Sequence, residues 1–181
     1  MNRISNASGK SRQRKPAKGN ALLASAIAAL SLGYVSSAVA LTNVNGFNAV
    51  DCGVACQYTD SGASGEVIVD KSHSVVSFQN MSIANGELLS FNGTTAGYSL
   101  LVRVTDSVSV IQGAIDGNLA QLVISNQNGL VFDGATISNI GAVVATTGEI
   151  NNFGVDPLRF DIENIDPNSC LLYTSDAADE S

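Results

Sequence analysis

The chain has 181 residues, with nine Lys or Arg, sixteen Asp or Glu, three Cys, one His and no Trp. Six of the basic residues lie in the first forty positions and three of the acidic ones in the last twelve, so residues 41–169 hold three basic and thirteen acidic residues, a formal net charge of −10. A surface this acidic repels phosphate backbones and anionic lipid headgroups, which argues against nucleic-acid binding and against basic membrane docking.

The first forty residues have the architecture of a signal peptide. A basic start is followed by an apolar core from Ala21 to Leu32 and by the small residues Ala38-Val-Ala40. The core is shorter than the roughly 20 residues that a membrane-spanning helix needs, so we expect cleavage after Ala40 rather than a membrane anchor. The mature chain of about 130 residues is long enough for one domain with a core.

Short β-prone runs separated by turn signals fill the mature chain, in which Gly, Ser, Asn, Thr and Val dominate. We expect strands at residues 66–69, 74–78, 88–91, 99–104, 108–111, 119–124, 130–132, 136–140 and 142–145. Turn signals stand between nearly all of them, at Asn85-Gly86, Asn92-Gly93, Asp116-Gly117, Asn128-Gly129, Asp133-Gly134 and Thr147-Gly148. The pattern predicts an all-β protein, and its spacing alone suits a sandwich as well as a solenoid.

Cys52 and Cys56 are expected to form a disulfide, because nearby thiols of an exported chain pair in an oxidising compartment. A metal site is the alternative, but it needs more ligands than these thiols and His73, the one histidine, supply. His73 stands between Ser72 and Ser74 in what looks like a strand start, where we expect an exposed turn histidine, and no nucleophile partner can be named for it. Three acids fall in predicted turns, where carboxylates bond the backbone: Asp106, Asp116 and Asp133. We therefore expect no catalytic residue, no cofactor and no metal.

A family resemblance comes from the stretch Ile115 to Thr147, in which short apolar runs alternate with Asn-Gly and Asp-Gly turns. It resembles the central block of the filamentous haemagglutinin N-terminal domain, the two-partner secretion (TpsA-type) domain. Residues 76–91 and 100–105 resemble that family's W-x-x-F-N-I-x-x-G-x-x-V-x-F and L-N-R-V-T segments, in the same order. The resemblance therefore covers roughly Gly65 to Thr147.

The family's secretion motif N-P-N-G is matched by Asn126, Gln127, Asn128 and Gly129, with Gln127 in place of the proline. A second departure is Val102, which stands where the family has an asparagine before the arginine. The motif also has a purely structural interpretation. Asn and Gly accept the left-handed backbone angles of a tight corner, and inward asparagines can ladder between coils.

The resemblance implies a right-handed parallel β-helix, a single-stranded pectin-lyase-like solenoid with an N-terminal cap. It divides the chain into a signal peptide (1–40), a cap (41–64), a β-helix (65–155) and the start of a continuation (156–169). The inward residues expected to form its apolar column are Leu122, Ile124, Leu130, Phe132, Ile137, Ile140 and Val143.

The function that the resemblance implies is that of the N-terminal secretion domain of an exported filamentous haemagglutinin-like adhesin. Its partner would be an outer-membrane β-barrel transporter of the TpsB type, which recognises the domain in the periplasm of a Gram-negative bacterium. A region further along the chain would bind a host or neighbouring-cell surface. The alternatives are a secreted β-helical polysaccharide-degrading enzyme and a structural surface protein. The oligomeric state stays open.

The last segment, Cys170 to Ser181, is expected to be foreign to the natural protein. Its wording Cys-Leu-Leu-Tyr-Thr-Ser-Asp-Ala-Ala-Asp-Glu resembles the translation of a transposon-based sequencing-library adapter. The natural chain is then expected to continue beyond Ser169, and Cys170 carries no redox meaning.

Overall fold

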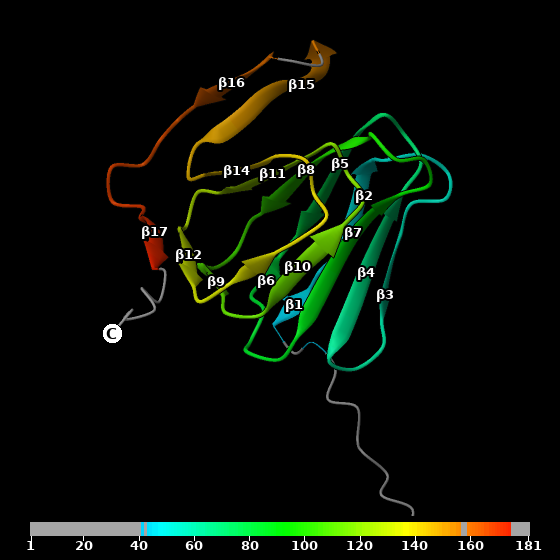
Figure 1. The fold of residues 1–181 in the computed structure, drawn as a ribbon. Coiled ribbons are helices and arrows are strands. Elements are labelled where there is room, and N and C mark those ends of the chain that lie inside the picture. Colours follow the sequence, from blue (N-terminus) through cyan, green and yellow to red (C-terminus); the bar gives the residue numbers. More distant parts are fainter. Residues whose placement is uncertain (1–40, 42, 157–158, 175–181) are drawn as a thin grey trace, which may run out of the picture. The chain divides into compact units, whose positions relative to one another are not determined.

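The computed structural model describes residues 41, 43–156 and 159–174, and the regular structure of these residues consists of strands without any helix (Figure 1). The expected signal peptide and its cleavage site at Ala40 lie outside the described residues. Within the described residues, no helix is long and apolar enough to cross a membrane.

Most strands stack as successive coils of a parallel β-helix (Figure 1). The first coil holds β4 (Ser64–Val69), β5 (His73–Phe78) and β6 (Asn80–Met81), and the second β7 (Leu88–Gly93), β8 (Ser99–Val104) and β9 (Ser109–Ile111). The third coil holds β10 (Ala114–Gly117), β11 (Gln121–Asn126) and β12 (Leu130–Asp133), and the fourth β13 (Thr136–Ile137), β14 (Val143–Thr146) and β17 (Leu171–Thr174). The register is continuous, because Ser64, Leu88, Ala114 and Thr136 occupy one position in successive coils. The expected all-β solenoid is confirmed.

The N-terminal end of the β-helix is covered by residues 44–60, which we call the cap and which hold three strands: β1 (Val44–Asn45), β2 (Asn48–Asp51) and β3 (Gln57–Asp60). They pair with β6, β5 and β4. The cap aromatics Phe47 and Tyr58 pack against Phe78 of the first coil, with ring centroids 5.4 and 5.5 Å from it. Because the cap strands pair antiparallel with the first coil, they occupy the strand edges to which a further parallel strand could otherwise add.

The core runs through the coils as columns of inward side chains at one register position, such as Val76, Val102 and Ile124, all without exposed surface. Burial of each such side chain contributes about 1.5–3 kcal/mol. The column members Leu122, Ile124, Leu130 and Phe132 are buried as expected, and Ile140 and Val143 pack partly buried against them.

The expectation that Ile137 would be buried is wrong, since 37% of its surface is exposed. It lies in register with the fully buried Ile115 but in the fourth coil, whose outer side no described strand covers. There Phe132, Ile137 and Val143 line part of an apolar hollow of about 340 Å³.

Two predicted turns are also wrong, since Asn92-Gly93 lies in β7 and Asp116-Gly117 in β10. Gly117 is needed for a close approach rather than a turn, because a Cβ there would lie 2.2 Å from the backbone oxygen of Phe91. The predicted strand ranges otherwise match the observed ones to within a few residues, except that 136–140 shortens to the two residues of β13.

A hairpin interrupts the fourth coil, formed by the antiparallel strands β15 (Glu149–Asp156) and β16 (Arg159–Glu163). Ile150 of this hairpin is buried against Leu101 and Val123, the outward residues of β8 and β11, with Phe153 and Phe160 packed at the edge of the cluster. The hairpin therefore gives the β-helix a second, smaller apolar cluster outside its central core.

Strand β17 falls inside the segment that resembles an adapter translation, and it adds in parallel to β12. An exposed strand edge offers free N–H and C=O groups to any chain of suitable pattern. A short, mostly apolar stretch such as Leu171–Thr174 can pair with that edge whatever its origin.

Candidate functional site

The corner between β11 and β12, residues Asn126 to Gly129, is held by one buried side-chain amide. Asn126 faces inward at the end of β11 and has no exposed surface. Its Nδ2 donates to the backbone oxygen of Ser107 at 2.8 Å and to Ser109 Oγ at 2.9 Å, while its Oδ1 accepts from the backbone N–H of Asn128 at 2.9 Å. These three hydrogen bonds satisfy the amide and join the corner of the third coil to that of the second. We call this segment the Asn126 corner.

The rest of the corner is a four-residue turn. The N–H of Gly129 donates to the backbone oxygen of Asn126 at 3.1 Å, and Gly129 has a φ of +121°, which L side chains rarely adopt. Asn128 Nδ2 donates to the backbone oxygen of Thr105 at 3.0 Å, a second link to the coil beneath. These contacts support the structural interpretation of the motif, in which Asn and Gly residues shape a tight corner and link it to the neighbouring coil.

Gln127, the departure from the family's proline, occupies the second position of this turn and is exposed. Proline is favoured at that position because its fixed φ suits it. Among the described contacts, no hydrogen bond uses the backbone N–H of Gln127. The local backbone therefore accommodates the family's proline as well as the glutamine.

Beside the corner lies a polar hollow of about 300 Å³. Its lining comes from β8 and the residue after it, from β11, from the Asn126 corner and from the hairpin: Arg103, Val104, Thr105, Ser125, Gln127, Asn128 and Glu149. Amide, hydroxyl, guanidinium and carboxylate groups meet there, a set suited to hydrogen-bonding a polar or extended peptide segment. Arg103 and Lys71 are the two Lys or Arg side chains that the structure describes, so Arg103 gives this hollow a positive charge that is rare in the described part of the chain.

Two polar bonds fasten the hairpin to the same region. Arg103 Nη2 donates to the backbone oxygen of Ile150 at 2.8 Å, and Ser125 Oγ donates to that of Gly148 at 2.7 Å. Together with burial of Ile150, they place Glu149 on the wall of the polar hollow. The hairpin and the Asn126 corner therefore both line the polar hollow.

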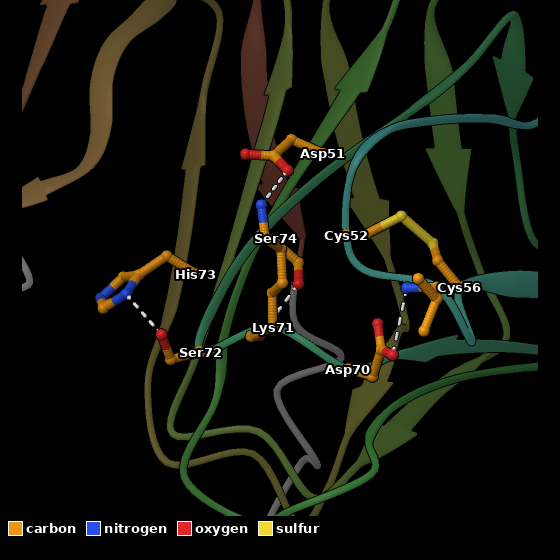
Figure 2. A network of polar contacts seen from close by, with 9 residues as sticks. Asp51, Cys52, Cys56, Asp70, Lys71, Ser72, His73 and Ser74 are labelled. Atoms are coloured by element: carbon orange, nitrogen blue, oxygen red, sulfur yellow. Dashed lines mark hydrogen bonds and ion pairs between the residues drawn. A yellow bond between two sulfur atoms is a disulfide. The ribbon is translucent and has the colours of Figure 1, made fainter.

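The second predicted feature, the pair Cys52 and Cys56, lies in the cap and forms a disulfide with a Cα–Cα distance of 5.5 Å (Figure 2). The ring that it closes contacts the turn between β4 and β5. Asp70 of that turn accepts hydrogen bonds from the ring, and the neighbouring Lys71 forms an ion pair with Asp51. The predicted secretion motif and the predicted disulfide are thus separate sites.

The remaining candidates do not assemble into a catalytic or metal centre in the described part of the chain. His73 is half-buried at the start of β5 rather than exposed in a turn, with its ring centroid 6.2 Å from that of Phe153. No group of three or more His, Cys, Asp or Glu residues able to hold a metal occurs among the described residues.

Of the three acids expected in turns, Asp106 lies in the connection between β8 and β9, where its Oδ1 accepts from Thr105 Oγ1 at 2.7 Å, and the other two lie in strands. Asp116 lies in β10, and its Oδ1 accepts from Ser138 Oγ at 2.8 Å and Asn139 Nδ2 at 2.7 Å, which holds the pKa of Asp116 below its ordinary value. Asp133 ends β12 and accepts from Gln112 Nε2 at 2.9 Å. Both carboxylates link successive coils instead of closing local turns.

Sequence reasoning missed two parts of this arrangement, namely the hairpin with its anchor Arg103 and the contact of Asp70 with the disulfide ring. Arg103 could be read from the L-x-R-V-T wording, but its partner lies 47 positions further along the chain. Asp70 lies 15 and 16 positions from its partners and carries no local signal.

Comparisons with known proteins agree on one family. The model of the TPS secretion domain family matches residues 51–170. The crystal structure of the HMW1 secretion domain from Haemophilus influenzae matches with a TM-score of 0.61 at 18% identity, over 72% of this chain and 35% of that chain. The present chain thus spans about a third of the HMW1 chain that it matches. A comparison with curated protein sequences finds no match.

At this identity the likeness to HMW1 establishes the fold, while the family model identifies the domain. The match of that model begins at the last residue of β2, runs through the Asn126 corner and the hairpin, and ends at residue 170, directly before β17. The chain therefore belongs to the TPS secretion domain family and carries the N-terminal secretion domain of a two-partner secretion (TpsA-type) exoprotein.

Proposed function

We propose that a TpsB-type outer-membrane transporter recognises this domain in the periplasm, and that the domain leads an adhesin-type exoprotein to the cell surface or beyond. The family match over residues 51–170 is the observation that carries the proposal. Export in this scheme begins with removal of residues 1–40 after Ala40. The downstream region, rather than the present domain, contacts a host or neighbouring cell.

The recognition surface in this proposal is the exposed side of the Asn126 corner with the polar hollow beside it. Gln127 and Asn128 are exposed there, and Arg103 and Glu149 complete the lining. The inward bonds of Asn126 hold the corner in one shape, so the exposed side chains present a fixed pattern to a partner. Preorganisation of this kind lowers the entropy cost of binding.

Folding of the coils that follow the recognised corner would take place after export, by propagation from the capped end of the β-helix. The cap covers the strands of the first coil, and each later coil pairs with the one before it. In a solenoid each repeat is stabilised by its neighbours, so a capped first coil is a natural starting point for propagation. Extended segments not yet folded remain free to add to strands of the transporter's periplasmic domains.

The test is binding of the full chain to the periplasmic region of the transporter encoded beside it, measured by surface plasmon resonance. The double variant Gln127→Ala/Asn128→Ala should weaken binding about tenfold, the effect of losing roughly 1.4 kcal/mol at an interface. Ser90→Ala in β7, on another sheet, is the matched control and should bind as the wild type. Equal binding by all three proteins would reject the proposed surface, and no binding by the wild type would reject the transporter as the partner.

A further inference from the structure

The junction between the cap and the first coil is built around one carboxylate. The segment Cys52–Cys56 connects β2 to β3 and lies over the turn that connects β4 to β5, which begins with Asp70 (Figure 2). Asp70 Oδ2 accepts hydrogen bonds from the backbone N–H groups of Val54 at 3.1 Å and Ala55 at 2.9 Å. Its own N–H donates to the backbone oxygen of Cys52 at 3.0 Å. The disulfide ring therefore binds the Asp70 carboxylate through two backbone N–H groups.

The fit between the ring and the carboxylate is close. Gly53 has a φ of +93°, and a Cβ there would lie 1.4 Å from Asp70 Oδ1, so a residue with a side chain cannot replace it without movement. Asp70 Oδ1 is buried and has no hydrogen-bond partner in the described part of the chain. Burying a carboxylate oxygen without a partner is unfavourable, so Asp70 stays in place only while the ring keeps both N–H groups directed at it.

The disulfide is the element that fixes the shape of this ring. It joins residues four positions apart, and Cys52 is itself buried in the core cluster. Without the bond, the backbone around Gly53 is free to rotate, and the two N–H groups need not point the same way. Rehydration of Asp70 would then favour separation of the cap from the first coil.

We propose that the disulfide is a redox-dependent fastener of the cap, which closes the cap onto the first coil through Asp70 only under oxidising conditions. In the closing step, the thiols of Cys52 and Cys56 form one S–S bond and give up two protons and two electrons. A disulfide-bearing oxidant accepts them and is reduced to two thiols. In a reducing compartment the thiols persist, and the cap side of β4 and β5 stays open. Fastening therefore occurs after the chain has left the cytoplasm.

Hydrogen exchange followed by mass spectrometry on the full 181-residue chain tests the proposal, with and without dithiothreitol. Reduction should speed exchange of the cap amides at residues 48–60 roughly 30-fold, as expected from losing the closure of a five-residue ring. Exchange in β8 and β11 should be unchanged. Equal loss of protection in the cap and in β8 and β11 would overturn the proposal, as would no change in the cap.

Asp70→Asn separates the fastener from a disulfide that merely stabilises the fold. This variant keeps the disulfide but loses the carboxylate, so its cap should exchange faster already when oxidised, and dithiothreitol should add less than about threefold. The matched control is Asp60→Asn in β3, whose carboxylate accepts only the local N–H of Gly62 among the hydrogen bonds described. That control should keep the full response to reduction. A full response in Asp70→Asn as well would show that the disulfide acts without Asp70.

Discussion

Replacing Asn126 by alanine should destabilise the domain by about 3 kcal/mol. The substitution removes three hydrogen bonds of a fully buried amide, each with a net value of about 1 kcal/mol, and strands the backbone oxygen of Ser107 and the hydroxyl of Ser109. A loss of this size is a large part of the 5–15 kcal/mol that typically holds a domain folded. Asn126→Asp should be at least as damaging, because it keeps the acceptor for Asn128 but loses both donors.

Equilibrium unfolding in urea, followed by circular dichroism, measures the effect. With an m-value of about 2 kcal/mol per molar urea, Asn126→Ala should lower the midpoint by about 1.5 M. The matched control is Asn128→Ala, which removes one exposed hydrogen bond and should lower the midpoint by only about 0.3 M. If the midpoints of the two variants agree, the inward amide does not hold the corner and the reasoning fails.

Three further predictions concern the corner, the hairpin and the cap. Gln127→Pro should raise the unfolding free energy by about 0.5–1 kcal/mol, because the preceding Asn126 is already extended and a proline reduces the conformational freedom of the unfolded chain. An unchanged or lower urea midpoint would contradict this expectation. Ile150→Ala should cost about 2 kcal/mol and make residues 149–163 sensitive to limited proteolysis, while uniform protection across the chain would argue against a separate hairpin cluster. Burial, aided by the charges of Asp60 and Glu87, raises the pKa of Tyr58 to about 12. The stability that depends on the protonated Tyr58 hydroxyl is therefore complete below pH 10 and is lost as the pH rises through 12. Absorbance at 295 nm should show one late-titrating tyrosine, and Tyr58→Phe should remove it.

The strands could be predicted well because most of them alternate inward and outward residues between glycine turns. The core residues Leu122, Ile124 and Leu130, expected from the family resemblance, are buried. The turn signal at Asp116-Gly117 was misleading, because a dipeptide typical of turns can also serve where two backbones approach closely, and only the neighbouring coil reveals which applies. Parallel stacking itself came from the family resemblance, since local periodicity is the same in a sandwich.

The candidate site could be predicted only in part, because some of its residues are contiguous in the sequence and others are far apart. The motif Asn126 to Gly129 is contiguous in the sequence and could be found there. The hollow beside it joins Arg103, Ser125 and Glu149 from different coils and the hairpin, and no local pattern encodes that meeting. The hairpin was missed because no strand is predicted after residue 145, and the contacts of Ile150 with Leu101 and Val123 join residues far apart in the sequence.

The shortness of the Cys52–Cys56 ring has a consequence for how the chain can travel. A disulfide between distant residues would tie the polypeptide into a wide lasso, which a narrow pore could pass only after reduction. A ring of five consecutive residues is instead a small protrusion on an otherwise linear chain, and the chain on both sides of it can be fully extended. The oxidised chain therefore remains a linear polypeptide without a large covalent loop. The disulfide in the cap is thus compatible with passage of the chain end to end through a channel.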